Sequence, residues 1–250
     1  MTAEYLTRID HEDGVVEIRL GRPPVNALSA AFLSDFGRII DSLGADDEVR
    51  AIMLSSEFKV FSAGLDLKEA QKFDLKDQHG IVKGLNEGFL SLFACPKPTV
   101  VAVNGAAIAG GLFFVLASDF RLAAPNVRFG LAEIRVGADF PVGPLEIARS
   151  MLGPNALRLL MLTGLPVDSA KAETLGLIDE IVPKDALWSR TMAAAKDLAQ
   201  LPPRTYASVK AQIRGETIRR IQTAIDNGAN APEGGWFNDE TVPAMKRMIG

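Results

Sequence analysis

The sequence predicts one α/β domain that ends in a helical region, and three observations indicate this. The chain has 250 residues, which is within the range of a single large domain. Before Pro141, short apolar stretches with strand periodicity alternate with stretches of helical periodicity, and after Pro141 the pattern is mainly helical. No internal repeat or low-complexity linker interrupts the chain. We therefore expect a continuous core over residues 1–195 and a helical C-terminal region over residues 196–250.

The strands are predicted from short apolar stretches. "VVEIRL" (15–20) alternates apolar and charged residues, as a half-buried strand does. "VRAIMLSS" (49–56) and "PTVVAVNG" (98–105) predict further strands, and the second ends in an Asn-Gly turn. "FRLAA", "VRFGL" and "LIDEIVP" predict shorter ones.

The helices are predicted from apolar residues spaced three to four apart. Such a stripe runs from Leu28 to Gly44. Gly164 and Asp168 are typical residues for the end of one helix and the start of the next. The stretch "NGANAPEGGWFNDE" has the composition of a loop, and a short terminal helix follows it. Further helices are expected after "VFSAGLDL", over about 81–93, 153–164, 167–176 and 184–200, and after "LPPRT".

Composition and charge disfavour several classes of protein. The net charge is −4 without a block of Lys or Arg, so we expect no nucleic-acid partner. Cys95 is the only cysteine, which rules out a disulfide within the chain and favours a reducing compartment. The N-terminal sequence lacks signal-peptide features, and no apolar run reaches the roughly 18 residues of a membrane span. We therefore expect a cytoplasmic protein without a membrane partner.

The chain offers few side chains for metal or nucleophilic chemistry. His11 and His79 are its only histidines, and each lies in a polar stretch without metal-ligand spacing. No G-x-S-x-G motif occurs, so Ser-His catalysis is unsupported. Any reaction must then use carboxylates and main-chain groups, with no metal.

Two glycine-containing turns precede helices, "FSAGLDL" and "IAGGLFF". Small residues let a ligand approach the main chain, and the first N–H groups of a helix have no partner within it. Two such turns facing one point would form an oxyanion hole, in which one donor is worth on the order of 3 kcal/mol. For either turn alone, tight packing is the simpler interpretation.

Glu133 lies among apolar residues in "VRFGLAEIRVGADFPVG". It could be a partly exposed residue that pairs with an arginine such as Arg128 or Arg135. Alternatively, burial could raise its pKa toward neutrality and make it a usable acid or base. The sequence does not distinguish the two.

Together these motifs resemble the crotonase superfamily, the enoyl-CoA hydratase/isomerase family. The resemblance extends over nearly the whole chain. It rests on "RPPVNALSAAFL", "VFSAGLDLKEA", "KPTVVAVNGAAIAGGLFFVLASDFRLAA", "RFGLAEIRVG" and "LTGLPVDSAKAETLGLIDEIVP". Several ordered motifs at matching spacing are far more specific than one glycine turn.

The resemblance implies a spiral of ββα units, followed by helices that build trimers or pairs of trimers. It implies a CoA thioester substrate, a place in fatty acid oxidation, and no cofactor beyond the CoA of the substrate. By motif position, the N–H groups of Leu65 and Gly110 would be the oxyanion donors and Glu133 the catalytic carboxylate. The residues expected beside the substrate are Ser62, Ala63, Gly64, Asp66 and Phe113.

One departure from the family pattern bears on the reaction. Hydratases of this family usually carry two glutamates, and Phe113 stands where the first of them would be. A 3,2-trans-enoyl-CoA isomerase needs only one carboxylate, which moves a proton from C2 to C4 of a 3-enoyl thioester. The resemblance therefore favours an isomerase, with Glu133 as the proton shuttle and Phe113 as a dry wall against water.

Several points stay open. Asp139, six residues beyond Glu133, could be a second acid for a hydratase or another reaction of this superfamily, or it could cap a helix. The chain could also be an acyl-CoA-binding protein without activity. Lys59, Lys68 or Lys210 could contact the phosphates of CoA. Several aromatic residues could shape an acyl pocket, namely Phe89, Phe93, Phe113, Phe114 and Phe140.

Overall fold

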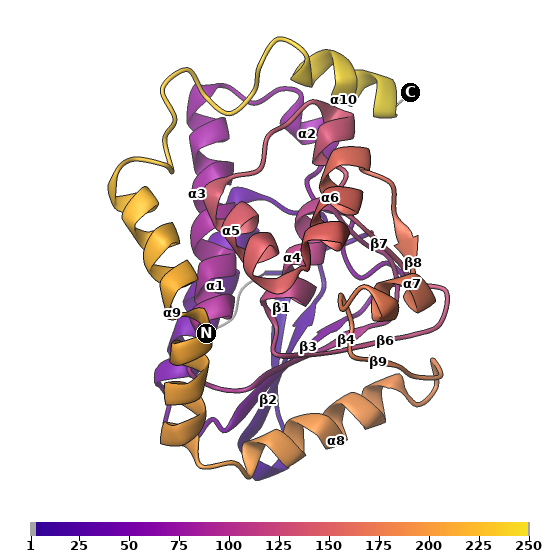
Figure 1. Ribbon diagram of the computed structural model, residues 1–250, viewed down its shortest axis with the longest axis vertical. Coiled ribbons are helices and arrows are strands. Elements are labelled where there is room, and N and C mark those ends of the chain that lie inside the picture. Colours follow the sequence, from indigo (N-terminus) through magenta and orange to yellow (C-terminus); the bar gives the residue numbers. More distant parts are fainter. Residues whose placement is uncertain (1–3, 250) are drawn as a thin grey trace.

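The computed structural model describes residues 4–249 and is an α/β fold built around a mostly parallel sheet (Figure 1). Strand β1 pairs with β2 in antiparallel register, and every following neighbour pair is parallel. The strands in spatial order are β1 (Leu6–Asp10), β2 (Val15–Leu20), β3 (Ala51–Ser56), β4 (Thr99–Val103), β6 (Phe120–Ala123) and β9 (Glu180–Ile181). A second, three-stranded sheet contains β5 (Ala107–Ile108), β7 (Arg128–Gly130) and β8 (Val167–Asp168).

Helices cover both faces of the main sheet (Figure 1). On one face, α1 (Ala30–Ala45) packs closely on α3 (Leu75–Ala94). Glycine at position 88 permits this approach, because a Cβ there would lie only 2.8 Å from the carbonyl oxygen of Leu33. On the other face, α8 (Leu187–Ala199) lies along β3 and β4. The remaining helical segments are η1 (Glu12–Gly14), α2 (Leu67–Ala70), η2 (Ala109–Leu112), α4 (Phe113–Ala117), η3 (Glu133–Val136), α5 (Val142–Met151), α6 (Pro154–Thr163), α7 (Ser169–Thr174), α9 (Pro203–Asp226) and α10 (Thr241–Ile249).

An aromatic cluster fills the space between the sheet and the helices α1, α3 and α4. Phe114 is fully buried, and its ring centroid lies 4.9 Å from that of Phe36 and 5.1 Å from that of Phe89. Such edge-to-face pairs add to the stabilisation that burial itself provides. The short apolar helix α4 is therefore fixed in place by the core on which its second residue packs.

Helix α9 is tied to the sheet by buried charges. Asp119 lies 2.7 Å from Nζ of Lys210 and 3.0 Å from a guanidinium nitrogen of Arg214. Both cations are buried, and Lys210 also donates to the carbonyl of Lys97. Since its ammonium group is enclosed and paired, the interpretation of Lys210 as a phosphate contact is wrong.

Most of the predicted elements are present. The two caps are confirmed: Gly164 ends α6 in the left-handed conformation, and the Asp168 side chain accepts a hydrogen bond from Lys171 N–H at the start of α7. The boundary placed between residues 195 and 196 falls inside α8, so core and C-terminal region share one continuous helix. Within residues 4–249, no helix combines the length and apolar character needed to cross a bilayer.

Candidate active site

The two glycine turns lie side by side, although more than forty residues separate them. Ser62 and Ala107 form a parallel bridge, and the N–H of Ile108 donates to the carbonyl of Ser62 at 3.0 Å. From the other side, Leu28 N–H donates to Gly64 O at 2.8 Å. This main-chain pairing brings residues 62–65 against the start of η2.

Glycine is required where the two turns meet. Gly64 has a φ of +78°, and a Cβ there would lie 2.8 Å from the carbonyl oxygen of Ile108. At Gly111 a Cβ would lie 2.5 Å from the carbonyl oxygen of Ser62, closer than such atoms can approach. The glycines therefore permit the contact itself, so tight packing accounts for part of both motifs.

The same arrangement leaves main-chain N–H groups unused. Gly110 is the second residue of η2, where N–H groups have no acceptor within the helix. Within residues 4–249, no acceptor is found for the N–H of Leu65 either. Both residues line one hollow, which also contains Glu133. Two unpaired donors and one carboxyl group therefore border the same space.

Glu133 opens η3, which is held from two sides. Nε of Arg135 donates to the carbonyl of Gly164 at 3.0 Å, which joins η3 to the end of α6. Oγ1 of Thr241 donates to the carbonyl of Gly137 at 2.6 Å, which joins η3 to the start of α10. These bonds fix the main chain that carries the Glu133 carboxyl group.

The Glu133 side chain is buried, and its Oε2 has no hydrogen-bond partner within the described residues. Burial disfavours the charged form and raises the pKa of the carboxyl to about 8, although a hydrogen bond from its own main-chain N–H opposes the shift. The alternative of an ion pair is wrong, because Arg135 and Arg128 donate to the carbonyls of Gly164 and Pro166 instead.

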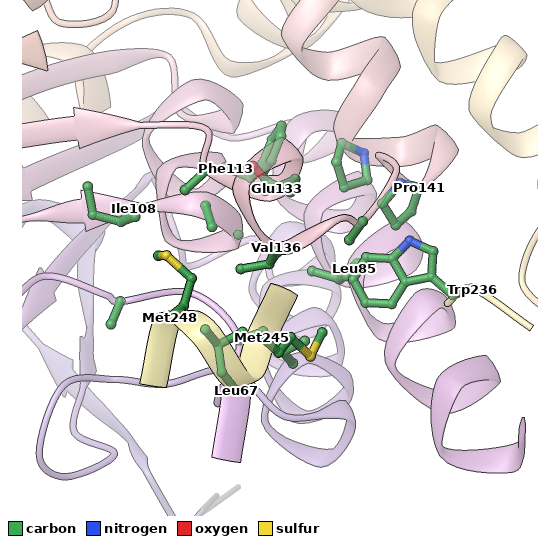
Figure 2. A pocket seen from close by; sticks show the side chains of 17 residues that line it. Leu67, Leu85, Ile108, Phe113, Glu133, Val136, Pro141, Trp236, Met245 and Met248 are labelled. Atoms are coloured by element: carbon green, nitrogen blue, oxygen red, sulfur yellow. The ribbon is translucent and has the colours of Figure 1, made fainter. Parts of the chain in front are cut away.

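The space around this carboxyl is almost entirely apolar (Figure 2). We call it the central hollow, and it encloses about 750 Å³ including its opening. Among the described residues that line it, Glu133 carries the only ionisable side chain. The lining residues are Ala63, Leu65, Leu67, Leu85, Ile108, Ala109, Gly110, Phe113, Ala132, Glu133, Val136, Ala138, Pro141, Pro144, Trp236, Met245 and Met248.

Three polar residues that were predicted to lie near the substrate do not line the central hollow. Ser62 is buried behind the turn, where its Oγ donates to Asn26 O at 2.8 Å. Asp66 caps α2, since its carboxylate accepts from the N–H groups of Lys68 and Glu69. Asp139 is exposed and lines a neighbouring surface hollow rather than the central hollow.

Of the aromatic residues considered for an acyl pocket, only Phe113 lines the central hollow. Phe89, Phe93 and Phe114 belong to the core, and Phe140 lines the neighbouring surface hollow. Sequence reasoning missed Trp236, Met245 and Met248, which the C-terminal segment contributes. Their signal was faint: an aromatic pair after two glycines, and apolar residues at helical spacing in "VPAMKRMI".

Known proteins resemble this chain in sequence and structure. The sequence profile of the Enoyl-CoA hydratase/isomerase family matches residues 10–231. The chain is 32% identical over 202 residues to a probable enoyl-CoA hydratase, EchA17, of Mycobacterium tuberculosis, covering 80% of this chain and 77% of that protein. It is 28% identical over 223 residues to a (7aS)-7a-methyl-1,5-dioxo-2,3,5,6,7,7a-hexahydro-1H-indene-carboxyl-CoA hydrolase of the same species, covering 88% of each.

A solved structure matches over nearly the whole chain. The crystal structure of human mitochondrial delta3-delta2-enoyl-CoA isomerase superposes with a TM-score of 0.90 at 27% identity, covering 98% of this chain and 97% of that one. The predicted crotonase-like fold with its helical C-terminal region is thereby confirmed. The chain belongs to the enoyl-CoA hydratase/isomerase family.

Proposed function

We propose that the protein is an enoyl-CoA isomerase that moves the double bond of a 3-enoyl-CoA to the 2-trans position. One observation carries this proposal: a single carboxyl group, that of Glu133, lies in an otherwise apolar hollow beside two unused main-chain donors. Net isomerisation consumes no water and no second acid or base. A hollow with one ionisable group is sufficient for it.

The reaction divides between main chain and side chain. The N–H groups of Leu65 and Gly110 bind the thioester oxygen of the substrate. The Glu133 carboxylate removes a proton from C2, and the electron pair of that C–H bond forms an enolate whose charge rests on this oxygen. The carboxylic acid then returns the proton to C4 while the double bond shifts from C3–C4 to C2–C3. The enzyme ends in the state in which it began.

Phe113 opposes hydration in this arrangement. Its side chain is buried, its ring centroid lies 5.6 Å from that of Phe89, and it lines the central hollow. A phenyl ring has no group that could take a proton from water or transfer one to C2. Addition of water at C3 of a 2-enoyl thioester would need a second group to position and activate that water.

The test gives the purified protein a 3-enoyl-CoA and, separately, a 2-enoyl-CoA. Migration of the double bond is followed by the ultraviolet absorbance of the conjugated 2-enoyl thioester, and hydration is followed by mass spectrometry, because it adds the mass of one water. We expect double-bond migration in the first case and no appreciable hydration in the second. Glu133→Gln should lower turnover by at least about 100-fold while acyl-CoA binding persists. The matched control Glu173→Gln, on the exposed face of α7, should be as active as wild type.

Hydration at C3 without double-bond migration would reject the proposal in favour of a hydratase. Binding of acyl-CoA with no turnover of either substrate would favour a binding protein. If Asp139→Asn lowered turnover as much as Glu133→Gln, a mechanism with two carboxylates would replace this one.

A further inference from the structure

The segment between α9 and α10 crosses the N-terminal half of α3 (Figure 1), and its residue Trp236 lines the central hollow. We call residues 227–240 the C-terminal strap. Nδ2 of Asn86 donates to Oδ1 of Asn230 at 2.9 Å, and Nε2 of His79 lies 3.0 Å from the carbonyl oxygen of Pro232. Side chains of α3 therefore fix the path of the strap before it reaches Trp236.

Trp236 is held at its main chain and at its indole ring. Oε1 of Gln78 accepts hydrogen bonds from the main-chain N–H groups of Trp236 at 2.9 Å and Phe237 at 3.0 Å. The indole Nε1 donates to the carbonyl of Asp139 at 3.0 Å. Phe237 in turn stacks on Phe73, with ring planes 4° apart. The indole therefore has a fixed position and orientation.

The residues that line the central hollow differ in exposure, and Trp236 itself is partly buried. Ala63 and Met248 are exposed, and Met248 keeps 53% of its surface accessible. Leu85 and Met245 are buried. Figure 2 places Trp236 on the same side as Leu85 and Pro141, and Ile108 and Met248 on the opposite side. A chain that enters past Met248 and extends beyond Glu133 would end against the indole.

We propose that Trp236 limits the length of the acyl chain that the central hollow accepts. The inference rests on the proposed function, since it takes the occupant to be an acyl-CoA with its thioester near Glu133. The other residues that the C-terminal segment contributes are methionines, whose flexible side chains adapt to a ligand. The clamped indole cannot adapt in this way, so it is the element that stops the chain.

The occupant also follows from the chemistry of the lining. Among the described residues that line the central hollow, only Glu133 and Trp236 have side chains that can donate a hydrogen bond, and the N–H of the indole is already bound to Asp139 O. A hydroxyl or second carboxylate on the acyl chain would therefore lose its water without gaining a partner. The preferred acyl group is a plain alkyl chain.

The test measures equilibrium binding of saturated acyl-CoAs from butyryl to palmitoyl, by calorimetry, to wild type and Trp236→Ala. For wild type we expect affinity to rise about fourfold per methylene and then to stop rising at a defined length. A tryptophan side chain buries about 150–250 Å², so its removal makes room for several further methylenes. In Trp236→Ala the rise should therefore continue by at least two more carbons.

Two further variants control for the fold. Trp188→Ala removes an indole from α8 that does not line the central hollow, and it should keep the wild-type length limit. Trp236→Phe loses the bond to Asp139 but keeps a ring, so its limit should lie between those of wild type and Trp236→Ala.

An unchanged length limit in Trp236→Ala would overturn the inference. A uniform loss of affinity at every length would overturn it too, because that result would mean that the indole only stabilises the strap. Because saturated thioesters are not turned over, the measurement is independent of isomerase activity. If no acyl-CoA of any length bound the wild type, the proposed function and this inference would both fail.

Discussion

Glu133→Gln should stabilise the protein at alkaline pH, although it removes the proposed base. Burial raises the pKa of Glu133 from its ordinary value of 4.5 to about 8. Between these two values the folded state holds a proton that the unfolded state has released, so the free energy of unfolding of wild type falls as pH rises. The stabilisation that the bound proton of Glu133 provides is fully present below the pKa of the unfolded state. It is lost as pH rises through the pKa of the folded state. Glutamine stays neutral throughout and escapes this loss.

The size of the effect follows from the same shift. One pKa unit corresponds to about 1.4 kcal/mol, and between pH 5 and pH 9 the difference in unfolding free energy between variant and wild type should grow by about 4 kcal/mol. Urea unfolding followed by circular dichroism at several pH values measures it. Glu173→Gln, on the exposed surface of α7, is the matched control against which the pH dependence of Glu133→Gln is compared. If the difference for Glu133→Gln did not exceed that of this control, Glu133 would not be desolvated, and the basis for its role as a base would be lost.

Three further predictions follow from the geometry. Because Glu133, as the proposed base, must lose its proton to act, kcat/KM should rise about tenfold per pH unit below pH 8 and level off above it, as measured with a 3-enoyl-CoA. Gly111→Ala places a Cβ 2.5 Å from Ser62 O and should separate the two turns, lowering kcat by about 100-fold or more. At Gly153 an added Cβ would meet no heavy atom of the described residues within 4 Å beyond its own chain neighbours, so Gly153→Ala should leave kcat unchanged. Asp119→Asn leaves the two buried cations of α9 without their counter-charge and should lower the urea-derived unfolding free energy by about 3–5 kcal/mol, a loss that an unchanged midpoint would contradict.

Local patterns were sufficient to predict most of the secondary structure. The apolar stripe of α1 and the caps at Gly164 and Asp168 depend on residues within one or two turns. Strand β1 was missed because Leu6 is its only buried residue, so it lacks the alternation of a half-buried strand. Helix α3 begins six residues before its predicted start, at the Asp74 capping box, because its first turn is polar and shows no apolar stripe.

The site could be predicted only in part, because some of its residues are brought together by contacts between distant parts of the chain. The two glycine turns and Glu133 were identified from motif order, and the structure brings all three to one hollow. The C-terminal strap was correctly predicted to be a loop, but its contribution to the site was missed. The path of the strap depends on side chains about 150 residues away, such as that of Gln78, which accepts a hydrogen bond from the N–H of Trp236. Contacts over such separations leave no periodic trace in the sequence. The sequence likewise could not predict which hollow Asp139 lines, because that depends on how η3 and α5 pack.

The apolar lining of the central hollow has two opposed effects on the proposed reaction: it excludes water, and it lowers the fraction of Glu133 that is ionised. Desolvation keeps most Glu133 carboxyls protonated at neutral pH, so only a minority of molecules is ready to remove a proton at any moment. A polar neighbour would lower the pKa and enlarge that minority, but it would also hold water beside the 2-enoyl product. Water so placed would open the route to hydration that Phe113 is proposed to close. In the proposed isomerase, the low fraction of ionised base is therefore the consequence of a hollow dry enough to keep the reaction from going further. Because the ionised carboxylate is poorly solvated, it is also a stronger base toward C2 than an exposed one, which offsets part of the loss.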